Sequence, residues 1–153
     1  MSPRTLYRRI ALAEVVSWAL LLLGMALKYV TRTTDLGVKV FGMVHGVVFI
    51  AFCLFTVLVW VNQRWTARQG LLGLASAVPP FLTVWFERRM ERAGALEGAW
   101  RLGHTEARPE NAVERVLHAL LARPAVAVAV GLVAVAALTG VALVVGPPAS
   151  VGG

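Results

Sequence analysis

Cysteines, charged side chains and catalytic motifs are all scarce in this sequence. Cys53 is the only cysteine among 153 residues, which excludes a disulfide framework within the chain and a paired-cysteine metal site. Charged side chains make up 15% of the chain, against about 25% in soluble proteins. There is no HExxH motif, no glycine-rich phosphate loop and no serine–histidine pair with an orienting acid. We therefore expect neither enzymatic activity nor a cofactor.

Long apolar blocks occupy most of the chain. Hydrophobic residues make up 58% of the sequence, and the mean hydropathy is +0.72. A helix of about twenty apolar residues is needed to cross a hydrocarbon core of about 30 Å. Four blocks approach this length, at residues 10–29, 38–61, 70–86 and 125–146. The sequence predicts an all-α fold, a polytopic membrane bundle of four transmembrane helices.

The chain divides into a core and an extension. Residues 1–92 hold the first three spans, 93–124 form an arginine-rich connection, 125–146 the fourth span and 147–153 a short tail. Within the connection, residues 111–123 carry apolar side chains at helical spacing: Val113, Val116, Leu117, Leu120 and Leu121. This pattern predicts an amphipathic helix at the membrane surface, or one that binds a cytosolic partner.

The third block is interrupted by Pro79 and Pro80. Proline lacks a backbone N–H group, so we expect a kink in the middle of this span. Carbonyl groups left without a partner are tolerated in lipid only where protein covers them. The third span is therefore expected inside the bundle.

The distribution of lysine and arginine predicts the threading. The first and third connections together carry ten of these residues, whereas the N-terminus and the second connection carry five. Because basic residues collect on the cytoplasmic side, we expect an inner (plasma) membrane protein with both termini outside and residues 87–124 in the cytoplasm. The net charge of +7 arises at the ends of apolar blocks, so we expect membrane lipid and not nucleic acid as its partner.

Glu14 and His45 are ionisable residues inside predicted spans, where such side chains are costly and mark functional sites. With each span centred in the bilayer, they are separated by about 15 Å along the membrane normal and cannot pair. Ser17 and Thr83 complete the candidate polar site, Thr83 at the depth of His45. For His45 the open alternatives are an interhelical hydrogen bond, proton or substrate handling, and metal ligation.

Two further groups of residues are candidates for contacts. Small residues that allow close helix approach are Gly42, Gly46, Gly131 and Gly140. At the cytoplasmic headgroup level, the candidates for anion or lipid contacts are Lys28, Tyr29, Arg32 and Lys39. Snorkelling of the two lysines to the interface is the simpler explanation for that second group.

Four short segments carry a resemblance: "AEVVSWALLL", "MALKY", "GMVHGVVF" and "PPFLTVWFERR". They resemble, in order, an uncharacterised family of small bacterial membrane proteins found in actinobacteria and bacilli, a domain of unknown function with three hydrophobic spans that is sometimes fused to transporter-like proteins. The likeness covers residues 5–92 and leaves 93–153 outside. Its motif positions fall on Glu14, Ser17, Lys28, Tyr29, Gly42, His45, Gly46 and Phe49. Val15 and Ala26 depart from the glycine and proline usual there.

These observations predict a non-enzymatic accessory, assembly or regulatory component of a larger membrane complex. The alternative is a small oligomeric transporter or channel-like protein that uses Glu14 and His45. In either case the expected partner is another membrane protein or a second copy of this chain.

Overall fold

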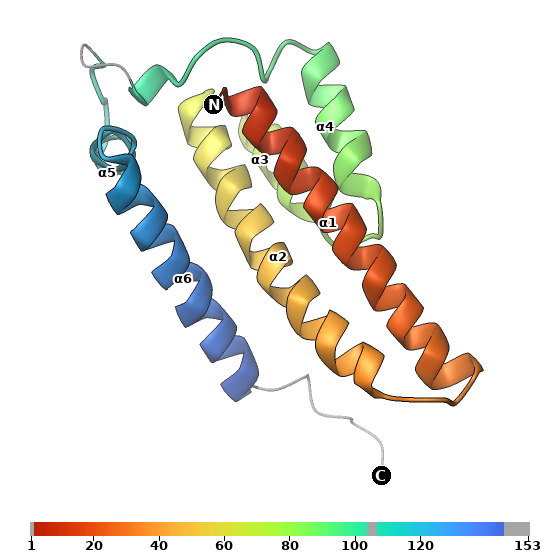
Figure 1. The fold of residues 1–153 in the computed structure, drawn as a ribbon. Helices are drawn as coiled ribbons and strands as arrows, with labels where there is room; N and C mark the ends of the chain where they lie inside the picture. The colour runs from red at the N-terminus through yellow and green to blue at the C-terminus, as the bar shows by residue number, and fades with distance from the viewer. Residues whose placement is uncertain (1, 104–106, 146–153) are drawn as a thin grey trace.

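The computed structural model describes residues 2–103 and 107–145, and its regular elements in these ranges are all helical (Figure 1). They are α1 (Pro3–Met25), a π-helical turn η1 (Ala26–Val30), α2 (Leu36–Asn62), α3 (Ala67–Ala75), α4 (Leu82–Arg92), a 3-10 turn η2 (Arg101–Gly103), α5 (Ala112–Leu121) and α6 (Pro124–Val145). The predicted all-α membrane bundle is confirmed. The predicted tail, 147–153, lies outside the described residues.

Three helical segments are long and apolar enough to cross a membrane: Pro3–Val30, Leu36–Asn62 and Pro124–Val141. The predicted span over 70–86 is not among them. That block forms the short helices α3 and α4, joined by a turn over residues 76–81. With 9 and 11 residues, each helix covers only about 15 Å.

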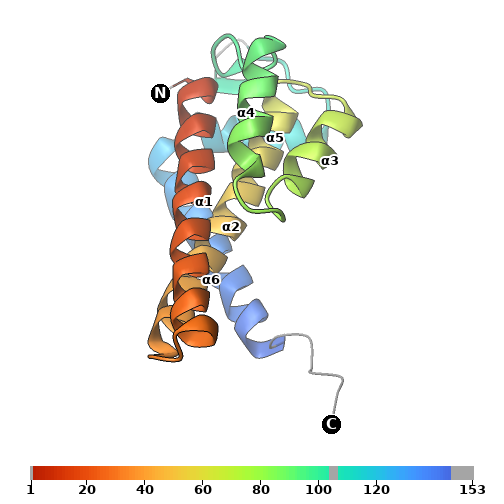
Figure 2. The same ribbon diagram turned by 90° about the vertical axis from the view of Figure 1, so that its right-hand side faces the viewer.

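The two prolines explain why the third block folds back instead of crossing. Proline disfavours helical geometry at the residue before it, so α3, which ends at Ala75, cannot continue through Pro79 and Pro80. Phe81 then takes a left-handed conformation with φ of 67°. Figure 2 shows α4 beside the upper half of α1 and α3 on the other side of α4, with their connecting turn near mid-height; α3 contacts α2 and α4. We call these two helices, Ala67–Arg92, the re-entrant hairpin.

The hairpin returns the chain to the end where it started. Arg4 forms an ion pair with Glu91, and the Trp65 indole N–H donates to the carbonyl of Ala95 at 2.8 Å. The N-terminus and the arginine-rich connection therefore lie at one end of the bundle, whereas the α1–α2 loop and Val145 lie at the other (Figure 1). The prediction placed the N-terminus and residues 87–124 on opposite sides of the membrane, whereas in the structure the hairpin returns the chain to the end of the bundle that holds the N-terminus (Figure 1).

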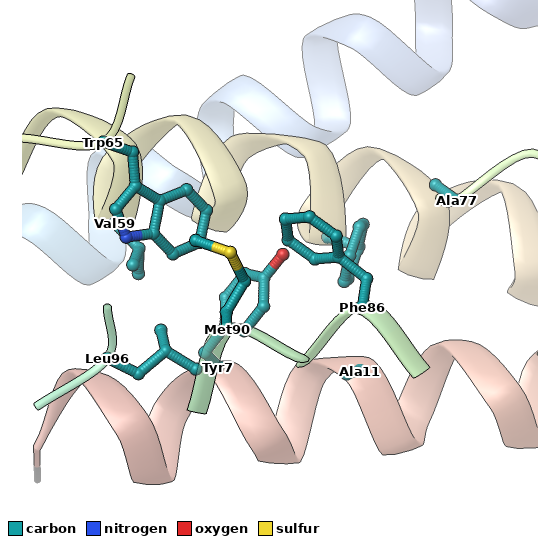
Figure 3. Close-up of a cluster of buried hydrophobic side chains, with 9 residues drawn as sticks. Tyr7, Ala11, Val59, Trp65, Ala77, Phe86, Met90 and Leu96 are labelled. Atoms are coloured by element: carbon teal, nitrogen blue, oxygen red, sulfur yellow. The ribbon is translucent and has the colours of Figure 1, made fainter. Parts of the chain in front are cut away.

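An aromatic core joins the hairpin to the two long helices. The ring of Tyr7 lies 5.7 Å from Phe52, 5.6 Å from Trp65 and 6.5 Å from Phe86, measured between centroids. Figure 3 shows Tyr7 between α1 and the rings of Trp65 and Phe86, with Met90 beside it. All four rings are buried, so contacts between aromatic side chains hold the hairpin in place.

Helix α1 packs antiparallel to α2 along most of its length. Ser2 caps its N-terminus by accepting a hydrogen bond from the Thr5 N–H at 3.2 Å. The closest approach is between Gly24 and Gly37, where a Cβ atom added to Gly24 would lie 2.7 Å from the Gly37 carbonyl carbon. This glycine contact defines how the two helices are aligned.

The glycines predicted as packing residues do not make the close contacts within this chain. At Gly42 an added Cβ would meet only Leu21, at 3.8 Å. At Gly46, Gly131 and Gly140 no described atom lies within 4 Å of that position. Packing through the two α6 glycines remains a prediction for contacts with another chain.

Replacing Gly24 by alanine should destabilise the protein. The added methyl group would collide with the backbone of Gly37, and overpacking of this kind costs about 1–3 kcal/mol. Gly46→Ala is the matched control, since its methyl group meets open space and alanine favours a helix. Unfolding by titration with a denaturing detergent measures both variants. Equal stability of Gly24→Ala and Gly46→Ala would contradict the close contact of Gly24 with Gly37 and hence this alignment of α1 and α2.

Candidate functional site

Three of the four predicted polar residues meet between α1 and α2. Ser17 Oγ lies 2.9 Å from His45 Nδ1 and 3.3 Å from Glu14 Oε2, and His45 Nδ1 lies 3.8 Å from the same Glu14 oxygen. Exposure is 0% for Glu14, 2% for Ser17 and 9% for His45. We call these three residues the polar cluster.

The predicted separation of Glu14 and His45 by about 15 Å was wrong. That estimate centred the first apolar block, which begins at Ile10, whereas the helix itself begins at Pro3. Contacts on both sides of the polar cluster give the true alignment: Gly24 packs on Gly37, and Tyr7 Oη lies 3.3 Å from Thr56 Oγ1. In that alignment Ser17 stands opposite His45.

Thr83 is buried but lies outside the polar cluster. Its hydroxyl donates to the carbonyl of Ala11 at 3.3 Å, one helical turn before Glu14 and not beside His45. It fastens α4 to α1. Asn62, at the end of α2, is also outside the polar cluster: its side-chain oxygen accepts a hydrogen bond from the Leu102 N–H at 3.1 Å.

Trp18 links the polar cluster to the turn of the re-entrant hairpin. Its ring lies 4.3 Å from the His45 ring, between centroids, and its indole N–H donates to the carbonyl of Ala77 at 3.2 Å. The proline break leaves that carbonyl without a helical partner, so Trp18 supplies the cover expected for it. Tryptophan is usual at membrane interfaces, so its position in the middle of a span is the sequence feature that could have indicated a structural role for Trp18.

The polar cluster is poor in metal ligands. Across the described parts of the chain, no three histidine, cysteine, aspartate or glutamate side chains gather as a metal site requires. Glu14 Oε1 is buried and has no hydrogen-bond partner among the described residues. The arrangement is chemically suited to holding a proton, because a carboxyl, a hydroxyl and an imidazole share hydrogen-bonding distance.

The four residues predicted at the headgroup level lie around the α1–α2 loop and are engaged locally. The Lys28 ammonium lies 5.2 Å from the centre of the Tyr29 ring. Lys39 forms an ion pair with Asp35 at 2.7 Å, and its hydrogen bond lowers the pKa of that carboxyl. Arg32 is exposed in the loop. They lie at one end of the bundle, but no described interaction joins all four into a single site.

A second polar network attaches the arginine-rich connection to the end of α2. Arg101 donates to the backbone carbonyl of Asn62 at 3.0 Å and to Glu114 Oε1 at 2.5 Å. Glu114 is only 4% exposed. The Glu110 backbone N–H and then the Arg101 guanidinium hold the pKa of Glu114 below its usual range. This network docks α5 against the bundle.

Helix α5 agrees in position with the predicted amphipathic helix, but the residues that it buries differ from those predicted. It buries Glu114 and Leu117, and His118 Nδ1 lies 2.7 Å from the Leu102 carbonyl oxygen. Val113 and Val116, expected on the same apolar face as Leu117, are 60% and 61% exposed. A buried ion pair thus replaces part of the apolar contact that the pattern predicted.

Docking of α5 should weaken in acid. A carboxyl with a lowered pKa stabilises the docked state when ionised, and this stabilisation is lost as the pH falls through that pKa, below the ordinary value of 4.5. We expect amide hydrogen exchange over 112–121, corrected for intrinsic rates, to accelerate in that range while α2 stays protected. Glu114→Gln should exchange rapidly at neutral pH already, whereas Glu97→Gln, an exposed control, should not. Unchanged protection in Glu114→Gln would contradict this role.

Comparison with known proteins identifies the core of the chain. The family model of a domain of unknown function, DUF3817, matches residues 4–92, which end where α4 ends. A relative from Streptomyces coelicolor, named "Putative membrane protein SCO5905", is 47% identical over 88 residues. That match covers 57% of this chain but 10% of the relative, and no solved structure matches. Because the family model covers more than half of the sequence, this protein belongs to the DUF3817 family of uncharacterised membrane proteins.

Proposed function

We propose that this protein is a non-enzymatic accessory component of a larger membrane complex, in which it takes part in assembly or regulation. One observation carries the proposal: the 88-residue unit shared with the Streptomyces protein is there 10% of a much longer chain. In the Streptomyces protein this unit is part of a large membrane polypeptide. In the present protein the same unit could associate with a large membrane polypeptide as a separate subunit.

Helix α6 offers the surface for that association. It touches α2 and α5, yet none of its spanning window, Pro124–Val141, is buried. Gly131 and Gly140 meet no described atom within 4 Å. Helices associate in lipid through small residues that let backbones approach closely. The family match ends before α6, so this helix is an addition to the shared core.

The charge distribution supports one orientation in the plasma (inner) membrane. Twelve of the fifteen lysines and arginines lie in or beside the N-terminus, the α2–α3 turn and the segment from α4 to α6, all at one end of the bundle. The three at the other end are Lys28, Arg32 and Lys39. The positive-inside rule therefore favours a cytoplasmic N-terminus and arginine-rich connection, with the α1–α2 loop outside.

A small oligomeric transporter or channel-like protein is the second candidate. The polar cluster favours it, because buried ionisable groups at membrane depth are typical of ion pathways. A single copy places only two spanning helices around the cluster, so such a pathway requires several copies.

Labelling of introduced cysteines tests the orientation. In a Cys53→Ala background, Ser2→Cys and Arg108→Cys should both be protected from a membrane-impermeant thiol reagent in intact cells, whereas Thr33→Cys should react. After the membrane is permeabilised all three should react, which controls for accessibility. Reaction of Ser2→Cys and Arg108→Cys on opposite sides would contradict the re-entrant hairpin.

Purification in mild detergent with mass spectrometry tests the accessory role. The wild-type chain should bring down one larger membrane protein in a fixed ratio. The Gly131→Ala, Gly140→Ala double variant should lose it, because an added methyl group blocks close approach while meeting no described atom of its own chain within 4 Å. Val133→Leu, on the exposed surface of α6, is the control. Recovery of an isolated oligomer would favour the transporter instead.

A further inference from the structure

The hydrogen atoms of the polar cluster can be assigned from its geometry. Ser17 Oγ has three partners: the Glu14 carbonyl oxygen at 2.9 Å, Glu14 Oε2 at 3.3 Å and His45 Nδ1 at 2.9 Å. A hydroxyl donates one hydrogen and accepts through its two lone pairs. The carbonyl oxygen can only accept, so the one arrangement that makes all three contacts hydrogen bonds gives the serine hydrogen to that oxygen.

The other two contacts then need hydrogens from Glu14 and His45. Oε2 approaches Ser17 as a hydrogen-bond donor only in a protonated carboxyl group, and Nδ1 does so only when it bears a hydrogen. We propose that Glu14, Ser17 and His45 form an intramembrane proton-binding site, with the bound proton on Glu14 Oε2 and the neutral imidazole as the Nδ1–H tautomer. This site goes beyond the accessory role, which assigns no task to these residues.

The surroundings of Glu14 favour the neutral acid. Its side chain is fully buried, and Oε1 has no hydrogen-bond partner among the described residues. An ionised carboxylate without partners is costly in such a place. Helix α1 packs against α2, α4 and η1, so these elements supply the neighbouring charges.

Those neighbouring charges leave Glu14 largely uncompensated. Helix α2 contributes His45 and the Cys53 thiol, which interacts electrostatically with Glu14. In α4, Glu87 interacts with charged groups at the basic end: Arg4, Arg8, Arg88 and Glu91. In η1, Lys28 lies against Tyr29. His45, whose Nδ1 lies 3.8 Å from Oε2, is therefore the basic side chain beside Glu14.

A change in where that proton is bound would affect the hairpin through Trp18. If Glu14 releases its proton and the bare Nε2 of His45 takes one up, a carboxylate and an imidazolium face each other, with Nδ1 3.8 Å from Oε2. The new cation then lies beside the Trp18 ring, at 4.3 Å between centroids, where a cation–π attraction is expected. Because Trp18 also holds the Ala77 carbonyl, the protonation state of the polar cluster is linked to the hairpin turn.

Infrared spectroscopy of the full chain in lipid bilayers tests the site. At neutral pH the wild type should show the C=O stretching band of a protonated carboxylic acid, and Glu14→Gln should lose it. Glu87→Gln is the control, because Glu87 is also buried with an unpartnered oxygen, and it should keep the Glu14 band. A wild type without such a band, or a band that survives in Glu14→Gln, would overturn the proposal.

A second measurement avoids reliance on a variant of Glu14. In ¹⁵N-histidine-labelled wild type, solid-state NMR should show His45 with hydrogen on Nδ1 and a bare Nε2 at neutral pH. The His45 signals are assigned by their loss in His45→Gln, with His118 as the internal reference. A bare Nδ1 would mean that Ser17 donates to His45, and the assignment of the proton to Glu14 would fail.

Discussion

The alignment of α1 against α2 is the constraint on which the rest of the structure depends. Two glycines at one end allow backbone contact, and Tyr7 beside Thr56 marks the other end. Between them the alignment brings Ser17 opposite His45. A shift by one helical turn, about 5.4 Å, would separate the two residues. A buried acid and a buried imidazole are each costly in lipid, so the close glycine contact makes both tolerable.

Lipid around the bundle also explains the role of Trp18. Hydrocarbon provides no hydrogen bonds, so a chain that turns back at membrane depth must cover its own backbone. The turn of the re-entrant hairpin places the Ala77 carbonyl within reach of Trp18, and the same indole ring packs on His45. The Trp18 side chain thereby donates a hydrogen bond to the carbonyl group left free by the break and also packs against the polar cluster. The most irregular backbone and the most polar side chains of the core are neighbours for this reason.

Helix α5 and its network position the addition to the family core. Arg101 and Glu114 attach the arginine-rich connection to the end of α2, so α6 starts at the basic end of the bundle. Its surface remains uncovered across the spanning window. The interior contacts of the bundle are thus separate from the exposed surface of α6. The proposed accessory role depends on this exposed surface of α6 and not on the polar cluster.

The amino-acid sequence by itself determined the helical fold, the membrane environment, the family and the residues of the polar cluster. These properties depend on composition and on local spacing. Twenty apolar residues predict a membrane span, and a lone acid among them predicts a polar site, however the helices pack. The tertiary structure decided whether Glu14 and His45 meet, since helix alignment depends on contacts between separate helices, Gly24 with Gly37 and Tyr7 with Thr56. It also decided that Pro79 and Pro80 reverse the chain instead of kinking a span. The prolines predict a break, but its direction is set by contacts of Tyr7, Trp65 and Phe86, and these form only when distant segments pack together.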